Sequence, residues 1–284
     1  MTSLLPVAKR LVKRPLYFVE RQLYLSGVLP RRRLTLPHFL GLGPGQAGTT
    51  WLHYNLSRHP DVFVPDKKEV HYFTKKFHRR PLGYYSSVFS EGRAKIRGEI
   101  CPGYNVLLQK RIRFIAKIMP DVRLFLIIRN PVDQAWSAAR RQLSKRARRL
   151  GKRLGELEDA NFYAFFEGYP KGLGDVVPGM QQTAYCQTID NWLKHFRPEQ
   201  LRILFFDEIR TNPADFLGKV CEHIGVRTGF EWDQEHLNVP VNQNAVYPLP
   251  ERFRAFLEDM HRGEVEELER RFGEPVMRWR RPDV

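Results

Sequence analysis

Apolar residues along this chain form short unbroken runs that alternate with stretches of helical spacing. The unbroken runs, typical of strands buried on both faces, lie at residues 34–43, 123–128 and 201–206. Helical spacing follows them, starting near Thr49, at Pro131 and over residues 216–224. Strands that alternate with helices run parallel and are joined by right-handed crossovers. The pattern therefore predicts an α/β fold, a single domain with a central parallel sheet flanked by helices and with ligands at the carboxyl ends of the strands.

Three further stretches have one apolar face at helical period, at residues 105–118, 183–196 and 250–272. We expect the last to be a packing helix without a catalytic role. Residues 151–178 have weak periodicity and several glycines. They are predicted to form an irregular excursion that either covers a site or lies at the surface.

Residues 1–33 are predicted to form a basic amphipathic arm that precedes a single domain at residues 34–284. Apolar residues recur there at helical spacing, at Leu4, Val7, Ala8, Leu11 and Val12, with lysines and arginines between them. Two interpretations stay open, a helix packed on the protein's own body and a helix on a membrane surface. Charged residues interrupt the arm, so it has no run of the roughly 18 apolar residues expected of a membrane-spanning helix.

The net charge of +16 is concentrated in two regions. Residues 1–33 contain eight Lys or Arg and one Glu, and residues 139–153 contain eight Lys or Arg and no acid. Such runs attract phosphate, sulfate or anionic lipid, or they simply form a solvated face. No nucleic-acid-binding module accompanies them, so nucleic acid is not an expected partner.

The three cysteines, Cys101, Cys186 and Cys221, are widely spaced and include no CxxC pair. This spacing does not suggest zinc or dithiol chemistry, and it favours a reducing compartment. We therefore expect a cytoplasmic protein, either free or peripheral at a membrane.

The most informative local feature is the sequence GLGPGQAGTTWL at residues 41–52, between a predicted strand and a predicted helix. Glycines let backbone N–H groups turn inward, and the helix N-terminus adds partial positive charge, so the turn suits an anion. The spacing of Gly43 and Gly48 matches the GxxxxGK[ST] loop of P-loop nucleotide-binding domains. Thr49, however, occupies the position of the lysine that a kinase would need to neutralise the phosphates. The alternative is a turn with a purely structural role. The hydroxyls of Thr49 and Thr50 favour a phosphate-binding site over that alternative, because they can donate hydrogen bonds to phosphate oxygens.

This loop resembles the 5′-phosphosulfate loop, KxGTTxL, of the sulfotransferases that use 3′-phosphoadenosine 5′-phosphosulfate (PAPS). The sequences HPDVFVPDKKEVHYF at 59–73, GEICPGYNVL at 98–107 and LFLIIRNPVDQAWS at 124–137 extend the resemblance to the heparan sulfate and bacterial sulfotransferases. YCQTIDNWLKHF at 185–196 and the stretch 203–226 also resemble that family, so the likeness covers residues 36–272. The fold it implies is P-loop-like.

The resemblance implies a role for each matching residue. The donor PAPS, and its product adenosine 3′,5′-bisphosphate (PAP), would be bound by Gly45, Gln46, Ala47, Gly48, Thr49, Thr50, Trp51, Arg129, Ser137 and Tyr185. Of these, Arg129 and Ser137 match the pair that holds the 3′-phosphate. Glu69 matches the general base, His71 would orient the acceptor or assist proton transfer, and no metal is expected. Without the resemblance, Glu69 would be interpreted as a surface partner of a neighbouring lysine.

Two departures from the family pattern matter. Gln46 occupies the position of the lysine that neutralises the leaving group, so Lys67 or Lys68 would have to replace its charge, or turnover would be slow. Residues 239–248, with Asn242, Gln243 and Asn244, replace a basic loop against the 3′-phosphate.

The sequence therefore predicts a sulfotransferase that moves a sulfuryl group to a hydroxyl or amine of a glycan, lipid or small molecule, with an anionic acceptor favoured by the basic run at 139–153. The alternatives are a nucleotide-binding, membrane-associated protein with little turnover, and a P-loop kinase.

Overall fold

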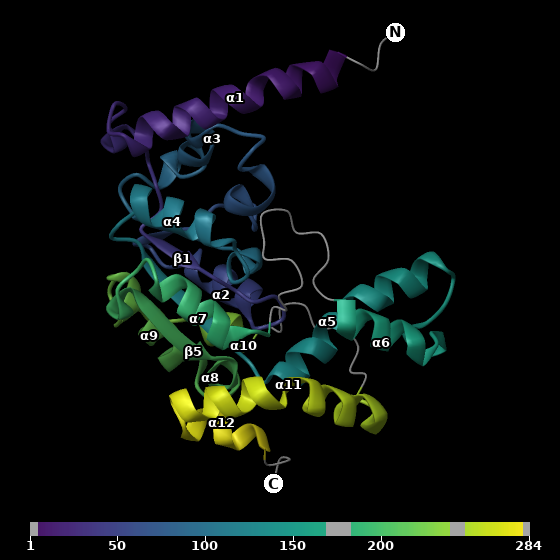
Figure 1. Ribbon diagram of the computed structural model, residues 1–284. Helices are drawn as coiled ribbons and strands as arrows, with labels where there is room; N and C mark the ends of the chain where they lie inside the picture. The colour runs from purple at the N-terminus through teal and green to yellow at the C-terminus, as the bar shows by residue number, and fades with distance from the viewer. Residues whose placement is uncertain (1–4, 169–182, 239–247, 281–284) are drawn as a thin grey trace.

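The computed structural model of the chain describes residues 5–168, 183–238 and 248–280. Five parallel strands form one sheet in the order β2-β3-β1-β4-β5 (Figure 1). The strands are β1 (Phe39–Gly41), β2 (Val62–Phe63), β3 (Ile96–Ile100), β4 (Arg123–Ile128) and β5 (Leu201–Phe205). The predicted α/β fold with a central parallel sheet is confirmed.

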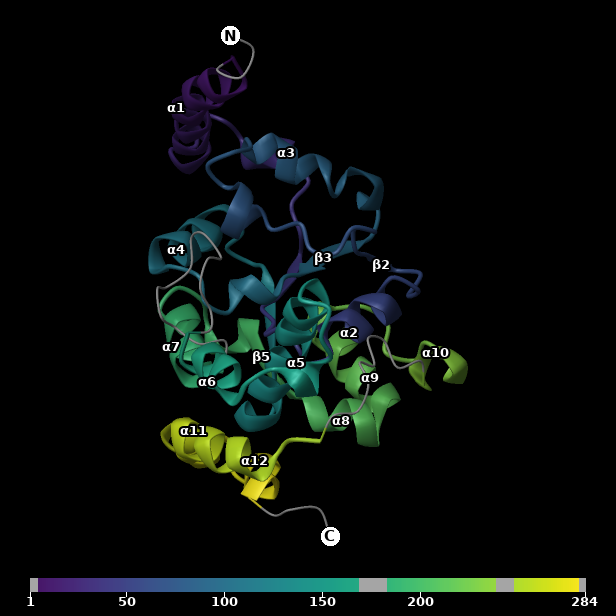
Figure 2. The same ribbon diagram turned by 90° about the vertical axis from the view of Figure 1, so that its right-hand side faces the viewer.

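Strand β4 shows why the sheet is buried on both faces. Leu124, Leu126 and Ile128 point into one apolar cluster, whereas Phe125 and Ile127 point into another. The first cluster lies under helices α4 (Gln109–Ile118) and α7 (Tyr185–Leu193), and the second lies under α2 (Thr49–Leu56) and α9 (Pro213–Ile224). The view in Figure 2 shows α4 and α7 on the opposite side of the sheet from α2 and α9.

The predicted strand at 34–43 is wrong in length, because only residues 39–41 pair as a strand. Pro37 has no N–H to donate to a ladder, and after Leu42 and Gly43, which still hydrogen-bond to β4, the chain turns into a loop. Strands β2 and β3 were not predicted, since β2 is two residues long and β3 has three buried residues only at its carboxyl end.

Helix α5 (Pro131–Arg149) begins at the predicted proline, where Asn130 accepts a hydrogen bond from the N–H of Val132. Its far half projects from the sheet beside α6 (Asp159–Gly168) and α11 (Glu251–Phe272), as Figure 1 shows. A third apolar cluster, which includes Trp136, Phe162 and Phe253, joins these helices. Within the stretch predicted to be irregular, α6 is therefore ordered helix. The remaining helices are α3 (Leu82–Ser87), α8 (Phe206–Thr211), α10 (Gln234–Asn238) and α12 (Glu274–Met277).

Helix α1 (Leu5–Leu25) packs on the body through its carboxyl half. The buried Arg21 donates to the carbonyl of Phe77 at 2.8 Å, and Glu20 accepts from the N–H of Leu82 at 2.9 Å. Leu16 and Phe18 are more than half exposed. No helix among the described residues is long and apolar enough to cross a membrane.

Candidate active site

The predicted site residues come together at the carboxyl edge of the sheet. The glycine-rich loop (residues 43–50) follows β1, Cys101 follows β3 and Arg129 follows β4. Because β1 lies between β3 and β4, these three ends are neighbours. Parallel strands thus place residues that are far apart in the sequence around one point.

Two glycines of the loop are required by its geometry. Gly43 has a φ of 98°, and a Cβ there would lie 2.4 Å from Pro102 Cα. Gly48 has a φ of 74°, and its Cβ would lie 2.5 Å from Ile209 Cδ1. Gly48 is the residue before α2, and no side chain caps that helix. The first N–H groups of α2, from Thr49 onward, are therefore without a side-chain cap.

Residue 46 connects the loop to the next strand and helix. The carbonyl of Gln46 accepts from Arg129 Nη1 at 2.7 Å, and its side-chain Oε1 accepts from Ser137 Oγ at 3.1 Å. One residue earlier, the carbonyl of Gly45 accepts from Gln134 Nε2 at 2.8 Å. The structure thus brings the predicted residues Gln46, Arg129 and Ser137 into direct contact, and adds Gln134, which sequence reasoning missed.

Arg129 is half-buried, and its guanidinium lies 4.4 Å from the centre of the Phe206 ring. Burial lowers the pKa of Arg129, although nearby acids, with Asp133 first among them, oppose the shift. Within the described part of the chain, its Nε has no hydrogen-bond partner. A half-buried guanidinium with an unused donor is suited to an anion.

Tyr185 and Trp51 lie near the loop but do not present their rings to it. The hydroxyl of the fully buried Tyr185 accepts from the backbone N–H of Arg129 at 3.4 Å, so it supports the end of β4. The indole of Trp51 packs against Phe216 and donates to the carbonyl of Leu237 at 3.0 Å. The side chain of Ala47 is also fully buried.

Lys68 approaches the N-terminus of α2 from another segment. Its Nζ donates to Thr49 Oγ1 at 3.3 Å and lies 3.7 Å from Glu69 Oε1. Thr49 is 4% exposed and the Lys68 side chain 13% exposed. Lys67, by contrast, is exposed.

Glu69 and His71 are in contact, with Glu69 Oε2 2.9 Å from His71 Nε2. His71 has a φ of 57°, in the left-handed region, and precedes the helical turn Tyr72–Lys76. The other ring nitrogen of His71 lies 3.5 Å from Cys101 Sγ and 3.2 Å from Thr74 Oγ1. Glu69 and Cys101 thus contact opposite nitrogens of the imidazole, an arrangement that suits a hydrogen-bonded chain better than ligands of one ion.

The charge state of Glu69 follows from its neighbours. Burial alone raises the pKa of Glu69, but the hydrogen bond to His71 and the charge of Lys68 outweigh burial and hold the pKa below its ordinary value. Glu69 is therefore a carboxylate at neutral pH and can accept a proton.

A second carboxyl group lies beneath this edge of the sheet. Glu99, at the end of β3, is fully buried and accepts from the hydroxyls of Tyr85 at 2.5 Å and Tyr104 at 2.7 Å. Burial raises the pKa of Glu99. Glu99 and Tyr104 belong to the GEICPGY sequence, whose role here is to join β3 to the aromatic core that includes Tyr72 and Phe73.

Asn242, Gln243 and Asn244, which replace the family's basic loop, lie outside the described residues.

Comparisons with known proteins identify the family. The family model "Sulfotransferase domain" matches residues 36–243. Bifunctional heparan sulfate N-deacetylase/N-sulfotransferase 3 of Homo sapiens is 25% identical over 221 residues, covering 70% of this chain and 23% of the relative. Heparan sulfate glucosamine 3-O-sulfotransferase 6 of Mus musculus is 30% identical over 200 residues, covering 69% of this chain and 54% of the relative. The chain thus spans about a quarter to a half of the length of these curated relatives.

A crystal structure of a sulfotransferase from Alicyclobacillus acidocaldarius has the same fold. It superposes with a TM-score of 0.62 at 23% identity and covers 86% of this chain and 99% of its own. The resemblance read from the loop and from the LFLIIRNP segment is therefore confirmed, and the chain belongs to the sulfotransferase domain family.

Proposed function

We propose that the chain transfers a sulfuryl group from PAPS to a hydroxyl or amine of an anionic acceptor. The observation that carries the proposal is the contact of Arg129 and Ser137 with Gln46 in the glycine-rich loop. Through these contacts the residues proposed for the 3′-phosphate lie beside the loop proposed for the 5′-phosphosulfate.

The residues present fit such a donor. The guanidinium of Arg129, which contacts the loop at the Gln46 carbonyl, would supply a charged donor to a 3′-phosphate, and Ser137 would add a hydroxyl. Ile209 and Phe206 exclude a side chain at Gly48, and the backbone N–H groups of Thr49 and Thr50 that follow would contact the 5′-phosphosulfate. PAPS supplies the activated sulfuryl group, and Gly45, Gln46 and Ala47 complete the loop that would hold it.

In the proposed reaction, Glu69 removes the proton of the acceptor. The acceptor oxygen or nitrogen bonds to sulfur as the bond from sulfur to the bridging phosphate oxygen breaks, and that oxygen keeps the electron pair. His71 holds Glu69 Oε2 at 2.9 Å and orients the carboxylate. By analogy with phosphoryl transfer, positioning and electrostatics would supply most of the rate.

The basic run at 139–153 supports an anionic acceptor. Its exposed members on α5 include Arg141, Lys145 and Arg148. Arg141 is close enough to Lys68 for its charge to oppose the charge of that ammonium. The relatives named above act on heparan sulfate, an acidic glycan, according to their names.

Titration calorimetry tests the donor, and a transfer assay tests the acceptor. We expect PAP to bind more tightly than ATP with magnesium, and preference for ATP would instead favour a kinase. Radiolabelled PAPS is then offered with heparan sulfate and with desulfated heparan sulfate. PAP binding with no transfer and no hydrolysis of PAPS would favour a nucleotide-binding protein with little turnover.

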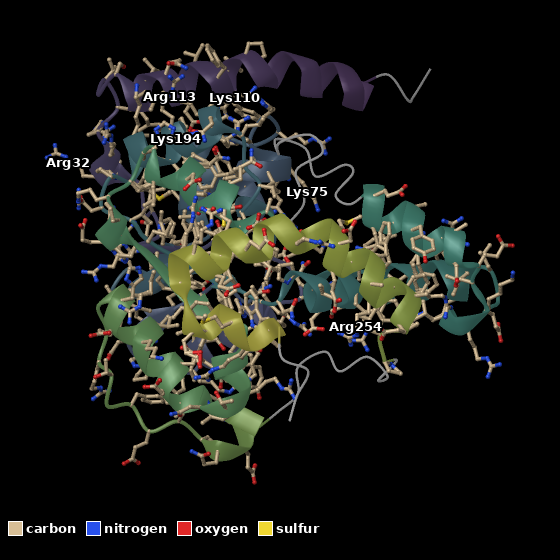
Figure 3. All side chains as sticks on the ribbon, turned by 60° about the horizontal axis from the view of Figure 1, so that its bottom comes forward. Arg32, Lys75, Lys110, Arg113, Lys194 and Arg254 are labelled. Carbon is tan, nitrogen blue, oxygen red and sulfur yellow. The ribbon has the colours of Figure 1, made fainter. Side chains whose placement is uncertain are left out.

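A peripheral membrane contact is a second candidate function, and α1 is the observation that favours it. Leu16 is 62% exposed, Phe18 58% and Val19 51%, all on the part of the helix that precedes its packed end. Lys110 and Arg113 project from α4 beside α1 (Figure 3), and α4 packs on α1. Exposed apolar residues flanked by cations suit an anionic lipid surface. A cytoplasmic location stays a prediction from the sequence.

A further inference from the structure

The glycine-rich loop lacks the positive charge that sulfuryl transfer needs at the leaving group. Gln46 brings none, and both of its oxygens are already used, by Arg129 and by Ser137. Lys68 instead brings a positive charge to the start of α2, where its Nζ donates to Thr49 Oγ1 at 3.3 Å. If the N–H and hydroxyl of Thr49 bind a phosphate, a small rotation of the Lys68 side chain would bring its Nζ into contact with that phosphate.

The surroundings of Lys68 leave its charge incompletely compensated. Its Nζ is 3.7 Å from Glu69 Oε1, longer than a charged hydrogen bond, and its side chain is 13% exposed. Burial lowers the pKa of Lys68, although Glu69 opposes the shift. A desolvated ammonium of this kind gains stability when an anion binds beside it.

Two other cationic side chains, Lys75 and Arg141, lie near Lys68 or His71 but have no contact with Thr49. Lys75, labelled in Figure 3, is exposed and has its Nζ 3.5 Å from His71 Nε2. Arg141 is exposed and acts on Lys68 only through its charge. Neither has a contact with Thr49 of the kind that Lys68 makes.

We infer that Lys68 replaces the missing loop lysine, contacting the 5′-phosphate of the donor and stabilising the negative charge that develops on the bridging oxygen. This inference rests on the proposed function. As the bond from sulfur to that oxygen breaks, the electron pair stays on the 5′-phosphate. The proton of the acceptor goes to Glu69, and Lys68 keeps its own proton throughout.

Titration calorimetry with two nucleotides isolates the contact. PAP carries both phosphates, whereas adenosine 3′-monophosphate lacks the 5′-phosphate that Lys68 would touch. We expect Lys68→Met to weaken PAP binding roughly 10- to 150-fold, the loss of one charged hydrogen bond, and to change adenosine 3′-monophosphate binding less than about twofold. Lys67→Met is the matched control. Lys67 precedes Lys68 in the sequence but is exposed, so this variant should leave both affinities unchanged.

The possible outcomes separate this inference from the proposed function. A wild-type protein that does not bind PAP would refute the function itself. Wild-type binding of PAP with equal affinities for Lys68→Met and Lys67→Met would refute only the role of Lys68. Retained binding of adenosine 3′-monophosphate shows that Lys68→Met is folded.

A charge exchange tests the replacement directly. In Gln46→Lys/Lys68→Met the lysine returns to the loop, and we expect PAP affinity and the rate of PAPS hydrolysis to recover to within about tenfold of wild type. A double variant that is no better than Lys68→Met would contradict the exchange of roles.

Discussion

The glycine before α2 offers the most quantitative test of the loop. At a φ of 74°, Gly48 lies in the left-handed region, which costs other residues about 1–2 kcal/mol. A Cβ would also lie 2.5 Å from Ile209 Cδ1 and 3.3 Å from Phe206 Cδ2, so α8 or the loop would have to shift. Overpacking of this kind costs about 1–3 kcal/mol. We therefore expect Gly48→Ala to lower the free energy of unfolding by about 2–5 kcal/mol.

Urea unfolding measures this loss, and calorimetry with PAP measures its effect on the site. Displacing the first N–H groups of α2 should weaken PAP binding by more than about tenfold. Gly263→Ala is the control, because Gly263 lies within α11 with open space around it, and alanine there should stabilise by about 0.5–1 kcal/mol.

Ile209→Val separates the steric cost from the backbone cost. Alone it removes Cδ1 at a cost of about 0.5–1.5 kcal/mol. Combined with Gly48→Ala, it should relieve the close contact, so that the double variant loses about 1 kcal/mol less than the sum of the single losses. Strict additivity would refute the steric argument, and a Gly48→Ala protein with wild-type stability and PAP affinity would refute the geometry of the loop.

Three other predictions test separate parts of the site. Glu69→Gln should lower the rate of PAPS turnover by roughly 10²- to 10⁴-fold while PAP affinity stays within about twofold, and unchanged turnover would exclude Glu69 as the base. Arg129→Met should weaken PAP by roughly 10- to 150-fold but leave adenosine 5′-monophosphate nearly unaffected, and equal losses for both nucleotides would contradict a contact with the 3′-phosphate. Leu16→Asp/Phe18→Asp should reduce sedimentation with phosphatidylglycerol vesicles, and wild-type sedimentation of this variant, or no sedimentation of the wild type, would refute the membrane contact.

The sequence predicted the parts of the site that depend on parallel strands. The run at 123–128 has no polar alternation and forms the buried strand β4, and Pro131 marks the start of the helix that follows it. The run at 201–206 also forms a strand, but β5 lies at the edge of the sheet and only Leu204 in it is buried. Once β1 and β4 are neighbours, the loop after one and Arg129 after the other must meet. Their contact, Arg129 Nη1 to the carbonyl of Gln46, is a consequence of topology.

The sequence did not predict the parts that depend on turns. Glu69 and His71 contact each other at 2.9 Å where His71 adopts a left-handed φ of 57°, and neither the contact nor that φ can be read from the sequence KKEVHYF. Nothing in KKEVHYF distinguishes Lys68 from Lys67 as the residue that reaches Thr49, because that choice depends on how the segment leaves β2. The role of Gln134 depends on the rotation of α5, which periodicity specifies only approximately.

Lys68 and Glu69 also influence each other, and this has a consequence for pH dependence. The hydrogen bond to His71 and the Lys68 charge hold the pKa of Glu69 below its ordinary value, so in the free protein the carboxylate loses its charge only at a lower pH than an ordinary glutamate. If Lys68 turns to the 5′-phosphate when PAPS binds, Glu69 loses that support and gains a nearby negative charge, and both changes raise its pKa. Donor binding would then make Glu69 a stronger base. For PAPS hydrolysis, the acid limb of kcat, which reports the bound state, should lie at higher pH than the acid limb of kcat/KM, which reports the free state. Coincident limbs would mean that Lys68 stays with Glu69 during the reaction, and the two residues would then have to be treated as a structural ion pair.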